Sequence, residues 1–351
     1  MNIDQTKPIL VTGASGYIAS WIVKFLLDGG HIVHATVRDP AKSSSVAHLL
    51  KLAAGASGTL KLFQADLLAQ GSFDEAMQGV ELVIHTASPF ILDGYKDAHE
   101  ALIRPALEGT QNVLNSVERT PSVKRVVLTS SVAAAYGEAV DLLREPNQTA
   151  TEDSWNTSSS LAHQPYSYSK TVAEQAAWAA NKLQSRWDLV CINPSLVLGP
   201  ALTTSSASGS IGVLKQCGDG TMAVAAPDLS FGVVDVRDVA QAHISAGFNP
   251  SAQGRYLISA QSMSLLQIGQ TLRHKYSRYP LPKRVMPKFI LMLLAPLVGQ
   301  TRAFIKHNVG YAVRIDTQKI QRELGVQYRD VQSTLEAHFQ QMIDDGLIKK
   351  R

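Results

Sequence analysis

The chain has 351 residues, 45% of them apolar and 18% charged, so it can bury a sizeable core and extensive disorder is excluded. Its formal net charge of +4 and the lack of a long Lys/Arg stripe argue against a nucleic-acid partner. Cys191 and Cys217 are the only cysteines, and they form neither a zinc pattern nor a disulfide framework, which fits a reducing cytoplasm.

The first half of the chain alternates short apolar runs with amphipathic stretches, as repeated βα units do. This order predicts an α/β fold, a doubly wound parallel sheet that binds ligands at the carboxyl ends of its strands. The expected strands are residues 8–12, 31–37, 59–67, 80–88, 123–131 and 188–200, and the expected helices are residues 16–30, 44–53, 97–119 and 166–185.

The stretch VTGASGYIA follows the first strand and opens the first helix. Gly13 allows a tight turn, Gly16 lets the backbone approach a phosphate, and Ala19 is small where the helix meets the sheet. Unpaired N–H groups and the positive end of the helix would hold a pyrophosphate. The turn therefore predicts dinucleotide binding by Thr12, Gly13, Ser15, Gly16, Tyr17 and Ile18.

The end of the second strand indicates which dinucleotide binds. NAD sites usually carry a carboxylate there, whereas this chain has Val37 followed by Arg38, with Lys42 nearby. Because a guanidinium can bind a 2′-phosphate through its planar fork, we predict NADP(H) as the cofactor. The alternative is that Arg38 forms a surface ion pair with Asp39 or Asp66.

Two further strand ends lie on the expected cofactor path. Asp66 and Leu67 follow the third strand and would meet the adenine edge, although Asp66 is also placed to cap a helix. Thr86, Ala87 and Ser88 follow the fourth strand, where small side chains leave room for the ribose and nicotinamide.

The stretch QPYSYSK places Tyr166 four residues before Lys170, so both side chains share one face of a helix, while Tyr168 faces elsewhere. A nearby ammonium would lower the pKa of a phenol, and Tyr166 would then exchange a proton with a carbonyl or alcohol oxygen. Ser131 ends the fifth strand and would hold the substrate oxygen, and Ser130 is the less favoured alternative.

The second half of the chain is less regular. Residues 202–210 are rich in Ser, Thr and Gly and form a candidate lid, and residues 231–248 predict a strand and a helix that rejoins the core. The apolar segment 289–298 is too short to span a bilayer; we expect a buried helix, with a membrane-surface or partner-binding helix as the alternative.

Other polar groups are expected to be structural. We expect His163 in a solvent-exposed loop, or else at the substrate mouth. We also expect a solvated acidic loop without metal-binding spacing, and no metal site; the loop comprises Glu138, Asp141, Glu145, Glu152 and Asp153. Phe90, Ile91, Tyr136, Leu196 and Phe231 are candidates for an apolar substrate wall.

The motifs TGASGYIA, ATVRDP, LTSSVA, PYSYSK, AEQAAW and INPSLVLGP resemble, in order and spacing, those of the extended short-chain dehydrogenase/reductases. The resemblance is dense over residues 8–248 and is strongest to the dihydroflavonol-4-reductase-like group, including microbial ketone and aldehyde reductases. It implies that Ser131, Tyr166 and Lys170 are catalytic, that Gly13, Gly16 and Arg38 bind NADPH, and that Pro194, Ser195 and Val197 border the nicotinamide.

The sequence also differs from members of this group at two places. Tyr136 stands where plant dihydroflavonol reductases often have asparagine, and HQPYSYSK replaces the NWYCYGK of cinnamoyl-CoA reductases. Both differences argue against a plant-type phenylpropanoid substrate.

We therefore expect an NADPH-dependent carbonyl reductase acting on a small molecule, without a membrane span and with a homodimer left open. A nucleotide-sugar epimerase or dehydratase, and an NADP-sensing binding protein, are the alternatives. Residues 1–200, rejoined by about 231–260, are assigned to an NADP-binding Rossmann domain. Residues 201–230 and 261–351 are assigned to a smaller, mostly helical substrate-binding lobe.

Overall fold

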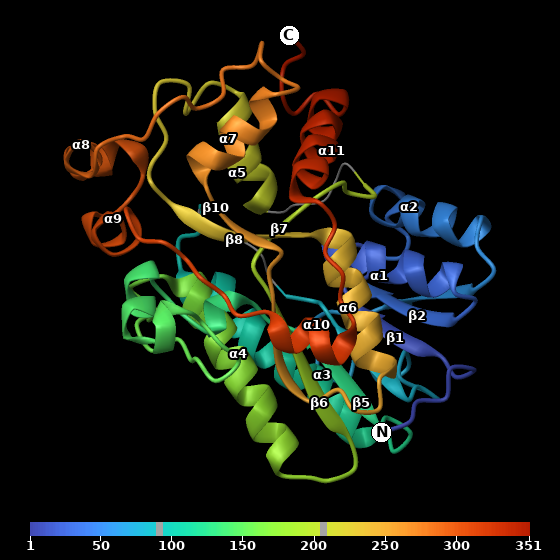
Figure 1. Cartoon of the computed structure of the whole chain (residues 1–351). Helices are drawn as coiled ribbons and strands as arrows, with labels where there is room; N and C mark the ends of the chain where they lie inside the picture. Colours follow the sequence, from blue (N-terminus) through green and yellow to red (C-terminus); the bar gives the residue numbers. More distant parts are fainter. Residues whose placement is uncertain (89–93, 204–208) are drawn as a thin grey trace.

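The alternation of apolar runs and amphipathic stretches builds a seven-stranded sheet in which every neighbouring pair of strands is parallel (Figure 1). The computed structural model describes residues 1–88, 94–203 and 209–351. In spatial order the strands are β3 (Thr59–Gln64), β2 (Ile32–Val37), β1 (Ile9–Thr12), β4 (Leu82–His85), β5 (Arg125–Thr129), β6 (Asp188–Pro194) and β9 (Gly254–Ile258).

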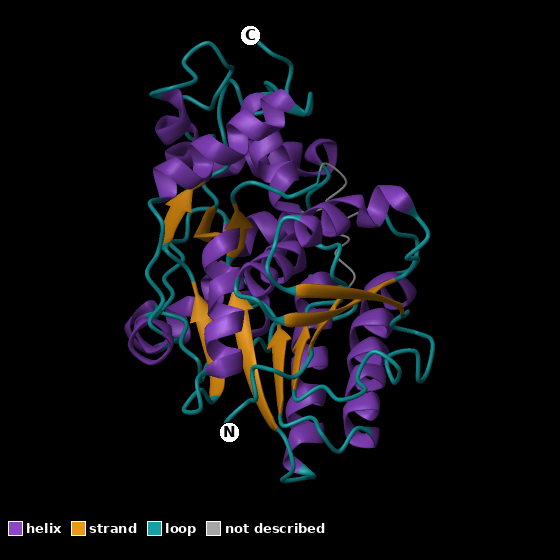
Figure 2. Cartoon of the chain, turned by 90° about the vertical axis from the view of Figure 1, so that its right-hand side faces the viewer, coloured by secondary structure: helices purple, strands orange, loops and turns teal. Residues whose placement is uncertain are grey.

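Helices cover both faces of this sheet (Figure 2). One face packs against α1 (Tyr17–Asp28), α2 (Ser43–Ala54), α6 (Val236–Phe248) and α10 (Gln318–Leu324). The other face packs against α3 (Arg104–Arg119) and α4 (Pro165–Lys182). The central strands β1 and β4 are buried along their whole length, which explains why they read as continuous apolar runs. The predicted doubly wound sheet is confirmed.

The order of the strands has a switch point between β1 and β4, and the space outside the carboxyl ends of these strands is called the crevice below. Strand β1 pairs with β2 on one side and with β4 on the other, so the chain reverses its direction of travel across the sheet between β1 and β4. Ligands of doubly wound folds bind outside the strand ends at such a point. The glycine turn after β1 lies there.

A second, smaller layer stands above the carboxyl edge in Figure 1. Its three-stranded sheet has the order β10 (Gln261–Ser264), β8 (Ser230–Asp235) and β7 (Leu196–Leu198). It shares an apolar core with α5 (Gly209–Gly218), α7 (Leu265–Arg273) and α11 (Val331–Asp344). The predicted strand and helix over residues 231–248 are present as β8 and α6, and α6 packs against α1 in the main domain.

The predicted loop over residues 202–210 lies partly outside the described residues, which exclude 204–208, and Gly209 and Ser210 already belong to α5. Of the proposed substrate wall, Phe90 and Ile91 also lie outside the described residues. Leu196 and Phe231 pack against the core of the upper layer, and Tyr136 packs beside Ala135 and Leu142.

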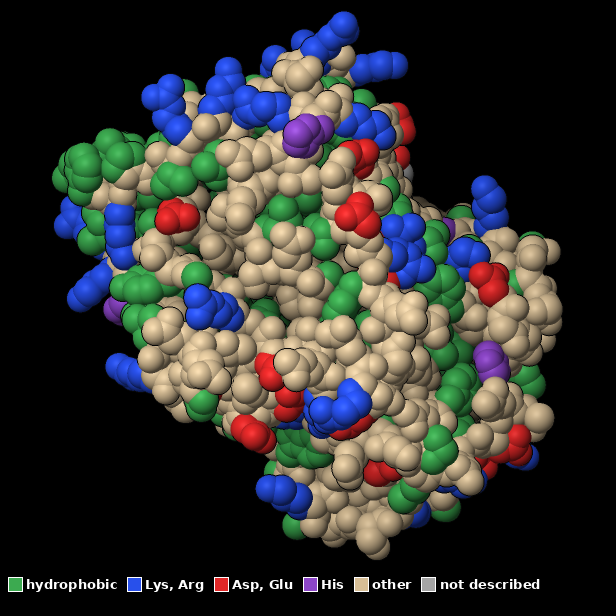
Figure 3. Space-filling view, viewed as in Figure 1, with side chains coloured by type: hydrophobic (Ala, Val, Ile, Leu, Met, Phe, Trp, Pro, Cys, Tyr) green, Lys and Arg blue, Asp and Glu red, His purple; other side chains and the backbone are tan. Residues whose placement is uncertain are grey.

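The expectation of a buried helix over residues 289–298 is wrong for most of its side chains. The segment forms α8 (Lys288–Leu294) and a 3₁₀ turn, and it packs with α9 (Arg302–Asn308) through Leu291 and Ala295. Phe289, Leu293 and Leu297 are 68%, 71% and 83% exposed, because their face of the helix has no packing partner among the described residues. Figure 3 shows this apolar patch at the upper left, with basic side chains around it. No helix among the described residues is long and apolar enough to cross a membrane.

Candidate active site

The glycine turn brings the end of β1 against the end of β4. Gly13 adopts a φ of +63°, a conformation that glycine tolerates and other residues rarely adopt. A Cβ atom at Gly13 would lie 2.9 Å from the Cα of Ala87, so the two chain segments touch at this point. The predicted cofactor residues Gly13 and Ala87 are therefore brought together.

The helix that follows has an uncapped positive end. Gly16 is the N-cap residue of α1 and provides no side-chain hydrogen bond, and the first turn carries no acidic residue. The first N–H groups of a helix lack intrahelical partners, and they attract an anion. The backbone of this turn is therefore suited to phosphate oxygens. Ser15, the residue before the N-cap, is half-buried.

The side chains of Tyr17 and Ile18, the first two residues of α1, contact other parts of the protein. The Tyr17 hydroxyl donates to the Gly199 carbonyl at 2.5 Å, and Ile18 of α1 packs against the core. Both residues were predicted to bind the cofactor. In this structure their side chains are used for packing, which leaves the backbone N–H groups of the first helical turn for a ligand.

Arg38 and Lys42 follow β2 on the exposed surface. Neither side chain has a hydrogen bond or ion pair with any residue that the structure describes. The alternative in which Arg38 pairs with Asp39 or Asp66 is therefore not formed; Asp39 instead accepts the N–H of Ala41 at 2.9 Å. Both cations lie just past the end of β2, at the position where the sequence predicts contacts to a 2′-phosphate.

Asp66 caps the turn after β3, whereas one of the two sequence interpretations expects it to cap a helix; the described residues between β3 and β4 form turns. Its Oδ1 accepts the N–H of Leu68 at 2.8 Å, and its backbone exchanges hydrogen bonds with the Ser72 hydroxyl. Leu67 lies against Gly109 of α3, where a Cβ would be only 2.9 Å from the Leu67 Cβ. The Asp66 carboxylate remains exposed at the carboxyl edge of the sheet.

Thr12 fixes the ends of β1 and β4 relative to each other. Its hydroxyl oxygen accepts the N–H groups of Thr86 and Ala87, both at 3.1 Å, and lies 2.8 Å from Nδ1 of His85. Burial, followed by the charge of Lys170, lowers the pKa of His85 to about 3, so this histidine is a neutral packed residue. Thr12 therefore acts through its neighbours, and not as an exposed ligand.

The predicted catalytic residues converge from two elements, the end of β5 and helix α4. Ser131 follows β5, and its hydroxyl accepts the N–H of Ala133 at 3.1 Å and forms a hydrogen bond with Tyr166. Tyr166 and Lys170 lie one turn apart on α4, with the Lys170 ammonium 5.9 Å from the centre of the Tyr166 ring. The ammonium donates to the Ser88 hydroxyl at 2.9 Å, which joins α4 to the end of β4.

The protonation of the pair differs from the sequence expectation in one respect. Burial raises the pKa of Tyr166, with the hydrogen bond from Ser131 opposing this effect, so the expected lowering by Lys170 is wrong. Burial lowers the pKa of Lys170 to about 8, and the Glu174 carboxylate opposes that shift. Desolvation is the largest effect on the pKa of both groups.

A buried polar network lies behind these residues, and sequence analysis missed it. The Glu174 carboxylate accepts from Ser130 at 2.5 Å, Asn193 at 2.8 Å, Arg255 at 2.7 Å and Trp178 at 3.2 Å. Asn193 also donates to the Ser131 carbonyl at 3.1 Å, which links the network to the site. Ser130 is thereby occupied inside the core, and Ser131 is the serine left at the crevice. Glu174 follows Lys170 by one helical turn, which is the only local signal of its role.

The exit of β6 is buried. Pro194 accepts a hydrogen bond from the Ser131 hydroxyl at 3.4 Å, which places its carbonyl beside the catalytic candidates. Ser195 lies against Gly232, and its buried hydroxyl has no hydrogen-bond partner among the described residues. Val197 packs in the main core, so its side chain is mostly withdrawn from the crevice.

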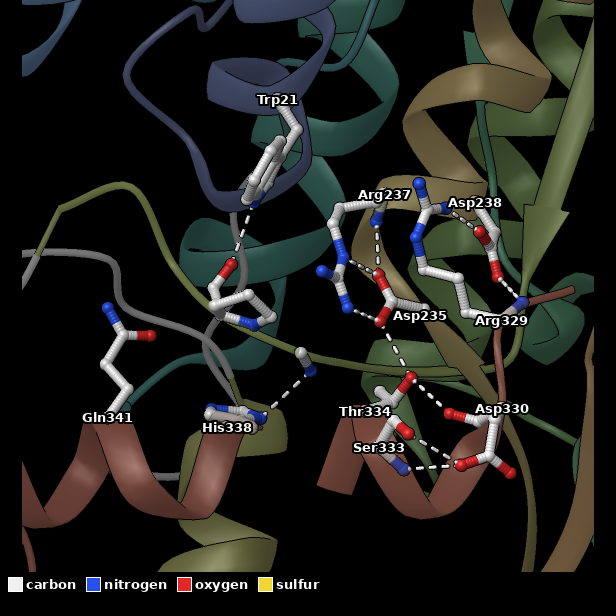
Figure 4. Close-up of polar contacts among 12 residues, drawn as sticks. Trp21, Asp235, Arg237, Asp238, Arg329, Asp330, Ser333, Thr334, His338 and Gln341 are labelled. Atoms are coloured by element: carbon white, nitrogen blue, oxygen red, sulfur yellow. Dashed lines mark hydrogen bonds and ion pairs between the residues drawn. The ribbon is translucent and has the colours of Figure 1, made fainter. Parts of the chain in front are cut away.

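Side chains from both ends of the chain clamp the segment 199–201 after β7 (Figure 4). From α1, Tyr17 and Trp21 donate to the carbonyls of Gly199 and Pro200. From α11, His338 accepts the Gly199 N–H at 3.1 Å, and Gln341 exchanges two hydrogen bonds with Ala201 at 2.7 and 2.8 Å. The same close-up shows Asp235 joined to Arg237 and Thr334, and Asp238 joined to Arg329, which fix α11 to the start of α6.

Comparisons with known proteins agree with this geometry. The profile of the NAD dependent epimerase/dehydratase family matches residues 9–258. Cinnamoyl-CoA reductase CAD2 of Medicago truncatula is 44% identical over 280 residues, covering 79% of this chain and 83% of that protein. Tetraketide alpha-pyrone reductase 1 of Arabidopsis thaliana is 42% identical over 292 residues, covering 80% and 85%.

Solved structures extend the similarity to the upper layer. Yeast methylglyoxal/isovaleraldehyde reductase Gre2, complexed with NADPH, superposes with a TM-score of 0.76 at 25% identity over 96% of this chain and 98% of that one. Gre2 of Candida albicans, also in complex with NADPH, gives 0.75 at 28% identity over 96% and 99%.

The sheet, the glycine turn and these matches define an NAD(P)-dependent reductase. The chain belongs to the NAD dependent epimerase/dehydratase family, the extended short-chain dehydrogenase/reductases.

Proposed function

We propose that this chain is an NADPH-dependent carbonyl reductase that converts a ketone or aldehyde to an alcohol. The observation that carries the proposal is the convergence of Ser131, Tyr166 and Lys170 beside the crevice between β1 and β4. A protonated phenol, a hydroxyl and an ammonium meet there, and together they form a proton-donating site for a carbonyl oxygen.

The residues around the crevice fit a phosphorylated dinucleotide. The contact with Ala87 leaves no room for a side chain at Gly13, and the uncapped end of α1 suits a pyrophosphate. Arg38 and Lys42 would hold the 2′-phosphate, and Asp66 and Leu67 would border the adenine. Thr86, Ala87 and Ser88 would lie along the ribose and nicotinamide, with the backbone of Pro194 and Ser195 and with Val197 on the opposite side.

Each catalytic candidate then has a distinct task. When bound, the reduced nicotinamide supplies a hydride to the carbonyl carbon. Ser131 orients the carbonyl oxygen by a hydrogen bond, and Tyr166 gives that oxygen its hydroxyl proton. Lys170 stabilises the phenolate that Tyr166 becomes, until a proton from solvent restores the phenol. The raised pKa of Tyr166 supports this direction, because it keeps the proton on the donor before reaction.

The relatives support a substrate with an apolar or aromatic body. Their names include a cinnamoyl-CoA reductase, a tetraketide pyrone reductase and a dihydroflavonol reductase, and a structural neighbour is a methylglyoxal/isovaleraldehyde reductase. We assign the substrate side of the site to residues 201–230 and 261–351, and the NADP side to residues 1–200 with the return at about 231–260.

A panel of carbonyl compounds tests the proposal. Absorbance at 340 nm would follow NADPH consumption with aliphatic and aromatic aldehydes, ketones and keto esters, with NADH in parallel. We expect turnover of several apolar carbonyl compounds, faster with NADPH than with NADH at equal low concentration. NAD(H) that stays bound through dialysis would instead indicate an epimerase. Tight NADPH binding without turnover would indicate a sensor, and either result contradicts the proposal.

A further inference from the structure

Three side chains that are far apart in the sequence meet outside the catalytic crevice. Glu138 caps the 3₁₀ helix η3 (Ala139–Arg144), His163 lies just before α4, and His307 lies in α9. One carboxylate oxygen and one imidazole nitrogen from each histidine all lie within 4.8 Å of one another. Figure 1 shows α9 above the green segment that carries η3 and the start of α4.

The expectation that Glu138 belongs to a solvated acidic loop is wrong, because its side chain is only 2% exposed. The carboxylate contacts His163 and the Asn308 side-chain amide, and it has no Lys or Arg partner among the described residues. A buried carboxylate is costly unless a cation or several hydrogen bonds compensate its charge. The contacts with His163 and Asn308 compensate part of that cost, and a metal cation beside the carboxylate would add to the compensation.

The two histidines offer ligands of the right kind. The His163 Nε2 faces Glu138. The rings of His163 and His307 stand edge-on to each other, with centroids 6.4 Å apart and an interplanar angle of 89°. His307 has no hydrogen bond with any described residue, so its ring nitrogens are free to bind. Two imidazole nitrogens and one carboxylate oxygen are the protein ligands of many zinc sites that keep a fourth position open.

The surroundings hold the ligands in place. The Asn308 side chain donates to Glu138 and accepts the Ala139 N–H at 3.0 Å, which orients the carboxylate as outer-shell partners do in metal sites. Backbone hydrogen bonds between Ser160 and His163, at 2.8 and 3.1 Å, fix the turn that carries His163. In a tetrahedral site with bonds of about 2.05 Å the ligand atoms lie about 3.3 Å apart. His307, half-buried on a short helix, would move inward by roughly an ångström to bind.

We propose that Glu138, His163 and His307 bind one divalent transition-metal ion of the zinc type. The ion replaces the direct contact between His163 and Glu138 and joins α9 to the turn that leads into α4. Hard cations such as Mg²⁺ are excluded by the two imidazole ligands, since they prefer oxygen. The site does not depend on the proposed reductase activity.

Metal titration of the full chain tests this site. Protein stripped with a chelator and dialysed would be titrated with Zn²⁺ in competition with a chromophoric chelator, and with Co²⁺ while the visible spectrum is recorded. We expect one equivalent of Zn²⁺ per chain and a Co²⁺ spectrum typical of four-coordinate sites. Mg²⁺ should not compete.

Variants locate the ion. Glu138→Gln, His163→Ala and His307→Ala should each weaken Zn²⁺ binding by about 10- to 100-fold or more, the range seen when site partners are lost. His274→Ala, at an exposed histidine outside the cluster, should bind as the wild type does. Because His307 makes no hydrogen bond with any described residue, metal-free His307→Ala should melt near the wild-type temperature. Zn²⁺ should raise the melting temperature of the wild type and of His274→Ala, but not that of His307→Ala.

Two results would overturn the site. One is a wild-type chain that takes up no Zn²⁺ against the competing chelator, which would leave Glu138 and His163 as an ordinary hydrogen-bonded pair. The other is uptake that persists in both His163→Ala and His307→Ala, which would place the ion elsewhere.

Discussion

Tyr166 and Lys170 are affected in opposite directions by the same burial. The buried phenol holds its proton more tightly, whereas the buried ammonium releases its proton more easily, with a pKa lowered to about 8. At neutral pH both groups are therefore protonated, as a reductase needs before hydride transfer. This balance distinguishes the pair from a tyrosine that works as a permanent phenolate.

The pKa of Lys170 predicts a limit to activity at high pH. Below about pH 8 the ammonium is present, and above that value it is lost, so kcat/KM for carbonyl reduction should fall as pH rises through about 8. In Lys170→Arg the side chain stays charged, so any remaining activity should lose this decline. A decline at the same pH in both proteins would assign it to another group.

Arg38 predicts the cofactor preference. Its guanidinium should contribute a charge-assisted contact to the 2′-phosphate, so Arg38→Leu should weaken NADPH binding by about 10- to 100-fold and leave NADH binding nearly unchanged. Fluorescence titration with both cofactors measures this. Lys51→Leu, an exposed lysine of α2, is the control and should change neither. Equal losses for both cofactors would contradict the role of Arg38.

Residue placements that depend on local spacing could be predicted, and contacts that depend on the rest of the fold could not. Gly13 and the pair Tyr166 and Lys170 are recognised from a few neighbouring residues. The sequence favours Ser131 over Ser130, but the structural reason lies in Glu174, which is 44 residues from Ser130 and accepts its hydroxyl. The direction of the Tyr166 pKa shift also depends on burial by distant elements, which spacing does not reveal.

At the scale of elements, the βα units bring the candidate site residues together where the chain after β1 touches the chain after β4. Gly13 combines two constraints, a positive φ and the Ala87 backbone, whose Cα would lie 2.9 Å from a Cβ at this position. Gly79 shares the first constraint, with a φ of +73°, but a Cβ there would meet no atom within 4 Å. Substitutions at the two glycines can therefore distinguish the cost of backbone strain from the cost of steric conflict.

Alanine substitutions at these glycines give a matched comparison. Gly79→Ala should lower the free energy of unfolding by about 1 kcal/mol through backbone strain alone. Gly13→Ala should cost more, about 3 kcal/mol, and should also abolish measurable NADPH binding, because β4 must move away from the turn. Urea unfolding and cofactor titration check both effects. Equal stability and intact binding in the two variants would contradict the contact with Ala87.

Element boundaries followed closely from periodicity, since the strands and helices of the first half match the predicted ranges within a few residues. The error at α8 has a different origin. Apolar composition shows that a segment can be buried, but burial requires a partner surface, and α9 covers only the side of α8 that carries Leu291. The exposed Phe289, Leu293 and Leu297 thus follow from tertiary structure, not from helix propensity.

At the scale of the whole molecule, long-range side-chain contacts join the C-terminal elements to the Rossmann core. His338 and Gln341 of α11 hold the segment 199–201, as Tyr17 and Trp21 do from α1. The clamp partners lie well over a hundred residues apart, and so does His307 from Glu138 and His163, so neither the clamp nor this cluster leaves a local pattern from which it could be predicted.

Three buried histidines predict how the whole fold responds to acid. Burial lowers the pKa of His85 to about 3 and those of His243 and His338 to about 4, against about 6.5 when unfolded. The unfolded chain therefore binds more protons between these values. Stability is nearly unaffected by these groups well above pH 6.5 and is lost as pH falls toward 4, by up to about 1.4 kcal/mol per unit for each histidine.

Denaturant unfolding from pH 8 to pH 5 measures this loss. With three such groups the free energy of unfolding should fall by about 3 kcal/mol between pH 6.5 and 5.5, a large part of a typical total. His243→Gln should reduce the slope by about a third. A free energy of unfolding that is constant over this range would show that the histidines are not held neutral.

The most direct test of the proposed mechanism is the rate of carbonyl reduction after Tyr166→Phe, with NADPH affinity measured on the same protein. We predict that kcat falls by about 10²- to 10⁴-fold while NADPH binds almost as in the wild type, since only the proton donor is removed. Tyr168→Phe, two residues along the same helix, should keep the wild-type rate. Full activity in Tyr166→Phe would contradict the proposed mechanism.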